Sequence, residues 1–139
     1  MKKSFVLFLI SGILAAGCSQ GSKEKQKNED PNKNLYDQVM DIHDDVMPKM
    51  DELYNLKRQL KEKVENSPDL VASKKQEIET TILLIDSASR GMMRWMNEFN
   101  PEEHNEDDLR QYLEDEMKRV QQVKETMIDA LEKGRKAIQ

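Results

Sequence analysis

The sequence predicts an all-α protein: an up-down-up antiparallel three-helix bundle of long helices, at about residues 35–65, 69–99 and 107–138, preceded by a signal peptide and a flexible linker. Three observations support this fold class. Three stretches carry apolar residues at steps of three and four. Asn-Ser-Pro at 66–68 and Asn-Pro at 100–101 separate them with turn signals. With 35% charged residues, 5% aromatic residues and five glycines, the composition is typical of long helices.

Residues 1–17 have the features of a signal peptide. Lys2 and Lys3 supply its positive start, and a twelve-residue run, Phe5 to Ala16, is apolar except for a serine and a glycine. A helix that crosses a bilayer needs about 20 apolar residues. The run is therefore too short for a transmembrane anchor, and we expect it to be cleaved.

Cys18 is the predicted lipidation site. The stretch LAAGC that ends at Cys18 resembles the lipobox of bacterial lipoproteins, with Ala15 at a position where a larger aliphatic residue is usual. The resemblance implies acylation of Cys18 and attachment to a lipid bilayer. The alternative is an ordinary secretory signal with a cysteine near the cleavage point. Cys18 is the only cysteine of the chain, so it cannot form an internal disulfide.

Residues 18–34 comprise the lipidated cysteine and a predicted flexible linker. From Ser19 to Asn34 the chain has no aliphatic or aromatic residue, so the segment cannot bury enough apolar surface to fold alone. The residue that follows Cys18 is Ser19, so the aspartate that acts as a retention signal at this position is absent. By resemblance to Gram-negative sorting, this predicts a cell-envelope location at the outer membrane.

Residues 35–139 form the predicted helical domain, with 16 basic and 24 acidic residues. An acidic domain disfavours nucleic acid as a partner. The interpretation leaves one alternative architecture, an extended coiled coil that completes its core by dimerising.

The three helices follow from their apolar positions. The first carries Leu35, Val39, Ile42, Val46, Met50, Leu53, Leu56, Leu60 and Val64. The second carries Val71, Ile78, Ile82, Ile85, Ala88, Met92, Met96 and Phe99. The third carries Leu109, Leu113, Met117, Val120, Val123, Met127, Leu131 and Ile138, with Asn105 or Asp107 as its predicted N-cap.

One stretch, VMDIHDDVMPKM at 39–50, collects methionines and a histidine. Steps of three and four place Met40, His43 and Met47 on one helix face. Antiparallel pairing around Ser67 puts His43 level with Gly91, which brings the segment MMRWM at 92–96 alongside.

Three interpretations of this cluster stay open. Methionine can fill gaps where Pro48 bends the first helix and Gly91 lets backbones approach. A methionine-rich surface can also bind a partner, an envelope protein or a second copy of the chain. Thioethers together with an imidazole can hold Cu(I), and the candidate ligands are His43, Met40, Met47, Met92, Met93 and Met96.

The sequence favours a non-catalytic binding or scaffold module without a cofactor, with copper binding as the alternative. It shows neither a nucleophile elbow nor a glycine-rich phosphate loop, so no enzyme is predicted. The segments IHDDVMPKM (42–50), LKRQLKEK (56–63) and SASRGMMRWMNEF (87–99) together resemble a group of small lipoproteins of Bacteroidota, some of them labelled after the viral A-type inclusion protein. The resemblance implies an envelope compartment and no particular activity.

Overall fold

A computed structural model describes residues 30–139, and it is all-helical over that range. Four α-helices and one 3-10 turn follow one another: α1 (Pro31–Val46), α2 (Lys49–Glu65), α3 (Ala72–Glu98), η1 (Pro101–Glu103) and α4 (Glu106–Ile138). The predicted all-α class is confirmed. The predicted signal peptide, the lipidation site Cys18 and the linker up to residue 29 lie outside the described range.

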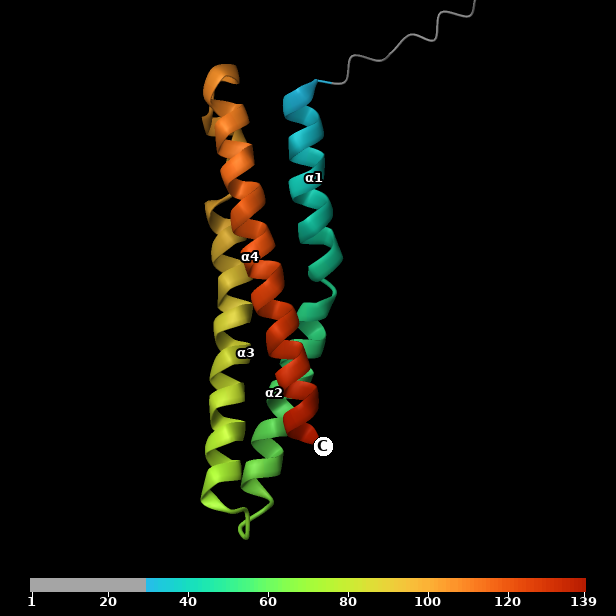
Figure 1. Cartoon of the computed structure of the whole chain (residues 1–139), viewed down its shortest axis with the longest axis vertical. Coiled ribbons are helices and arrows are strands. Elements are labelled where there is room, and N and C mark those ends of the chain that lie inside the picture. Colours follow the sequence, from blue (N-terminus) through green and yellow to red (C-terminus); the bar gives the residue numbers. More distant parts are fainter. Residues whose placement is uncertain (1–29) are drawn as a thin grey trace, which may run out of the picture.

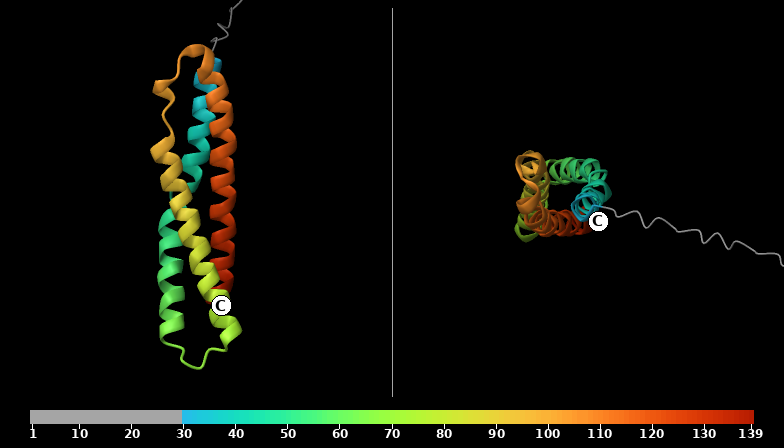
Figure 2. Two further views of the ribbon diagram at one scale, coloured as in Figure 1. Left: turned by 90° about the vertical axis from the view of Figure 1, so that its left-hand side faces the viewer. Right: turned by 90° about the horizontal axis from the view of Figure 1, so that it is seen from above.

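The helices lie side by side along one long axis (Figures 1 and 2). In Figure 1 the chain descends through α1 and α2, ascends through α3 and descends again through α4 to the C-terminus. Helix α4 packs against α1, α2 and α3, and α2 also packs against α3. The backbones of α1 and α3 share few close approaches. No helix of the described range combines the length and apolarity that crossing a membrane requires.

The predicted first helix, 35–65, differs from the structure at its start. Helix α1 begins at Pro31, because Asp30 is an N-cap whose side chain accepts a hydrogen bond from the Asn32 N–H at 2.9 Å. Proline is favoured in the first helical turn, where its missing N–H costs nothing. The last four residues of the predicted linker are therefore helical.

The same predicted helix is also interrupted. Helix α1 ends at Val46 and α2 begins at Lys49, because Pro48 has no N–H to donate and its ring crowds the preceding turn. The Lys49 ammonium donates to the carbonyl oxygen of Asp45 at 2.6 Å and so occupies a backbone acceptor beside the break. The predicted bend at Pro48 is confirmed, and it divides the element in two.

The two later helices match their predicted ranges to within three residues. Helix α3 ends before Phe99, whose extended backbone precedes Asn100 and Pro101. Helix α4 begins after Asn105, whose side-chain oxygen accepts from the backbone N–H groups of Asp107 and Asp108 at 3.0 and 3.1 Å. Of the two predicted caps, Asn105 is the correct one.

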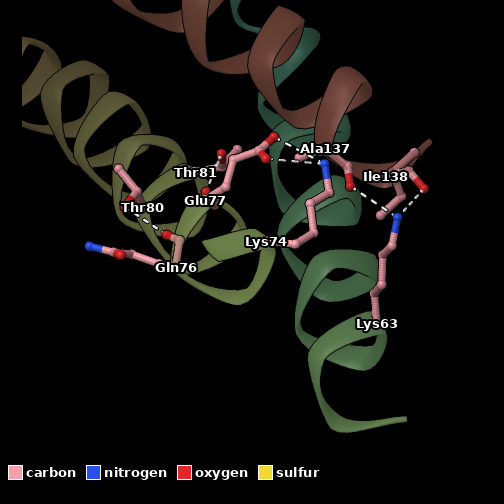
Figure 3. A network of polar contacts seen from close by, with 8 residues as sticks. All are labelled: Lys63, Lys74, Gln76, Glu77, Thr80, Thr81, Ala137 and Ile138. Atoms are coloured by element: carbon pink, nitrogen blue, oxygen red, sulfur yellow. Dashed lines mark hydrogen bonds and ion pairs between the residues drawn. The ribbon is translucent and has the colours of Figure 1, made fainter. Parts of the chain in front are cut away.

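The core runs the length of the rod. Its largest fully buried side chains are Leu53, Leu60, Ile78, Ile85, Met92, Leu113, Met127, Val39, Val46 and Val120. A tertiary contact also closes the far end of α4: the Lys63 ammonium of α2 donates to the carbonyl oxygens of Ala137 and Ile138 at 3.1 and 2.9 Å (Figure 3). These carbonyls have no partner within the helix, and a cation there also favours the helix dipole.

Ion pairs tie α4 to each of its neighbours. Asp45 of α1 pairs with Lys124, and Glu52 of α2 pairs with Arg135. Lys124 holds the pKa of Asp45 below its ordinary value, and Arg135 does the same to the pKa of Glu52. These exposed pairs orient α4 and contribute little stability individually.

Candidate functional site

A chain of aromatic rings runs through the end of the rod where α3 turns into α4. The His43 ring lies 5.7 Å from the Trp95 ring, centroid to centroid, and Trp95 stacks on Phe99 at 4.9 Å. Phe99 stacks on Tyr112 at 6.1 Å, and Tyr112 stacks on His104 at 3.9 Å. Both histidines of the chain therefore lie at the ends of one aromatic row. These rings bridge helices α1, α3 and α4.

The pairing of the first and second predicted helices is displaced from the sequence estimate. We expected His43 to lie level with Gly91, whereas its ring contacts Trp95, one helical turn further along α3. The displacement follows from the connection between α2 and α3, which runs from Asn66 to Val71 and is therefore centred beyond Ser67.

The structure separates the candidate copper ligands by their surroundings. Met93 and Met96 lie on the surface of α3, 48% and 37% exposed, while Met40 and Met47 on α1 are half-buried. Met92, by contrast, is fully buried in the core.

The imidazole of His43 has other neighbours. Its Nδ1 lies 2.8 Å from a carboxylate oxygen of Asp44, and its ring packs against Trp95. Within residues 30–139 no group of three or more His, Cys, Asp or Glu side chains is arranged to hold a metal ion. Copper binding by His43 and the methionines stays a prediction.

A buried carboxylate lies between α3 and α4. Glu116 is only 3% exposed, and one of its oxygens accepts from Arg119 at 2.6 Å. Arg119 also pairs with Glu98 of α3. Burial works against the charge of Arg119, but its hydrogen bonds to the two carboxylates outweigh burial, and the pKa of Arg119 lies above its ordinary value.

Two buried polar atoms here lack a hydrogen-bond partner within the described range: the indole N–H of Trp95 and the second carboxylate oxygen of Glu116. Phe99 stacks on Tyr112, Trp95 is four residues before Phe99, and Glu116 is four residues after Tyr112. In an antiparallel helix pair this places the two unpartnered groups at the same level. Such groups are rare in folded proteins because each costs about 1–3 kcal/mol.

Beside Trp95 a pocket of about 300 Å³ opens between α3 and α4. We call it the Gly91 pocket. Its lining residues are Ser87, Ala88, Gly91, Arg94 and Trp95 of α3, and Arg119, Gln122, Val123 and Thr126 of α4.

Glycine at position 91 leaves room for the pocket. A Cβ added there meets no atom within 4 Å. At Gly134 of α4, by contrast, the same atom would lie 3.1 Å from Leu56 Cδ1 and 3.3 Å from Ile85 Cδ1. Gly134 is therefore required by packing. The prediction that Gly91 allows backbones to approach is wrong, because the space beside it is open.

The pocket lining contains positively charged and polar groups but no acidic group. It offers two guanidinium groups, an amide, two hydroxyls and an indole, but neither a carboxylate nor an imidazole. A hydroxyl nucleophile needs a neighbouring base for activation, and the lining supplies none. The arrangement suits hydrogen bonding to oxygen atoms of a ligand.

Gly91 and the segment MMRWM at 92–96 are noticeable in the sequence but predict no pocket there, and the roles of Glu116 and Arg119 were not predicted. Glu116 could have been found from periodicity, because it lies three residues after Leu113 and four before Val120, in the apolar seam of the helix. An acidic residue in such a seam signals a buried partner.

The chain was compared with known proteins. No protein-family model matches it, and neither the curated proteins nor the solved structures contain a match.

Proposed function

We propose that this chain is a lipid-anchored, non-catalytic binding module of the bacterial cell envelope, folded as an up-down-up antiparallel three-helix bundle. Acylation at Cys18 would hold it at the outer membrane. Residues 19–29 would act as the tether between Cys18 and the helices. The bundle arrangement is supported by the packing of α4 against all three other helices.

The observation that carries the binding role is the Gly91 pocket. Glycine in the middle of a helix costs about 1 kcal/mol relative to alanine. Packing does not require it at position 91, since no atom lies near the missing Cβ. The lining also includes Trp95, whose buried N–H is unpartnered. A bound ligand would account for the glycine, because it would occupy the space beside position 91.

Native mass spectrometry tests the binding role. The full chain is extracted from its own membranes under mild conditions, together with the variants Gly91→Leu and Arg90→Leu. We expect a small-molecule adduct on the wild-type chain. Gly91→Leu should lose the adduct because the new side chain fills the pocket. Arg90→Leu should keep it, since Arg90 is an exposed neighbour outside the lining.

Two outcomes contradict the proposal: a wild-type chain without any adduct, and an adduct that survives Gly91→Leu. Circular dichroism checks that both variants are folded. The anchor is tested separately by fractionation, in which Cys18→Ala should move the chain from the membrane to the soluble fraction. Retention of that variant in the membrane would refute lipidation as the anchor.

A further inference from the structure

We propose that the Gly91 pocket binds a small organic carboxylate with an apolar body. This inference rests on the proposed binding function and names the chemical class of the ligand. Its size follows from the volume: at about 30 Å³ per water-sized group, the 300 Å³ pocket holds about ten non-hydrogen atoms.

Charge selects an anion. Arg94 and Arg119 line the pocket and no acidic residue does, although the domain as a whole is acidic. Within residues 30–139 Arg94 has no ion-pair partner, whereas Arg119 is paired with Glu98 and Glu116. Arg94 is therefore the cation available to a ligand, and its planar guanidinium matches a carboxylate with two parallel hydrogen bonds.

The buried Glu116 does not repel such a ligand strongly, because Arg119 neutralises it at 2.6 Å. Glu98 pairs with the same guanidinium, so Arg119 has no free positive charge to offer, and the attraction for an anion rests on Arg94. A ligand bearing a cationic group would face the guanidinium of Arg94, and no carboxylate lines the pocket to offset it.

The remaining lining fits the rest of the molecule. Ala88 and Val123 supply an apolar wall on opposite helices. Ligand sites commonly combine such walls with a few polar groups that fix orientation.

Trp95 is the only tryptophan of the chain and lines the pocket, so its fluorescence responds to changes there. The full chain, purified in mild detergent, is titrated with isocaproate and with isocaproamide, its neutral analogue of the same shape. Isothermal titration calorimetry gives both affinities independently. We expect isocaproate to bind about tenfold more tightly, the size of one hydrogen bond to a charged group.

Two variants test whether Arg94 supplies the positive charge that favours isocaproate. Arg94→Gln should remove the preference for isocaproate and leave the affinity for isocaproamide unchanged. Arg90→Gln removes an exposed positive charge one helical turn earlier on α3, so this matched control should keep the preference. Added salt should weaken isocaproate binding more than isocaproamide binding.

Equal affinities for the two compounds would overturn the inference and leave the binding function standing. Absence of any heat or fluorescence change at millimolar concentrations of both would also overturn it. A preference for isocaproate that persists in Arg94→Gln would do the same. The adduct experiment decides the binding function independently, since it does not depend on the ligand class.

Discussion

The two helical glycines predict opposite responses to the same substitution. Gly91→Ala should raise the free energy of unfolding by about 1 kcal/mol, because alanine gains helix propensity and its Cβ meets no atom within 4 Å. In Gly134→Ala the same gain is opposed by overpacking, since the new Cβ lies 3.1 Å from Leu56 Cδ1 and 3.3 Å from Ile85 Cδ1. Overpacking of a core costs about 1–3 kcal/mol, so this variant should be no more stable than the wild type.

Thermal and urea unfolding, followed by far-UV circular dichroism, measure both variants. A gain of about 1 kcal/mol corresponds to a rise in Tm of about 4 °C for a domain of this size. The comparison is internal, because both sites lie within long helices, Gly91 in α3 and Gly134 near the end of α4. Equal stabilisation by the two substitutions would refute the assignment of Gly134 to packing and of Gly91 to open space.

Three further predictions concern charge and metal. The pKa values of Asp45 and Glu52 lie below their ordinary values in the folded chain, so the stabilisation by these carboxylates is present above about pH 4 and is lost as the pH falls through the lowered pKa values. Asp45→Asn should therefore flatten the pH dependence of the unfolding free energy below about pH 4. An unchanged slope would contradict this prediction. Arg119→Met should lower the unfolding free energy by about 1–3 kcal/mol, because it leaves the buried carboxylate of Glu116 without its hydrogen bond. Adding Glu116→Met to this variant should recover most of the lost free energy. No recovery would argue against the buried pair as the cause of the loss. Titration with Cu(I) should give far less than one bound ion per chain, because His43 packs on an indole and two candidate thioethers are exposed. Uptake of one ion per chain that is lost in His43→Ala would instead support the copper alternative.

The candidate site was predictable only in its parts. Glycine in a helix interior, tryptophan one turn later and an acid in the apolar seam of α4 are all visible in the sequence. Their combination depends on which residues of α3 and α4 lie level, and that register depends on the irregular connection between Phe99 and Glu106. In the structure Val123 of α4 lines the pocket together with Ala88 of α3.

The sequence by itself determined the helical class, the two turns and the bend at Pro48, because periodicity, prolines and caps act over a few residues. It also determined that any helix on 35–65 would carry its methionines and His43 on one face. Only the tertiary structure decided what those side chains meet. Contacts between helices depend on register and spacing, which are set by the connection between α2 and α3 and by the connection before α4. These connections place His43 beside Trp95 and bring together the residues of α3 and α4 that line the Gly91 pocket.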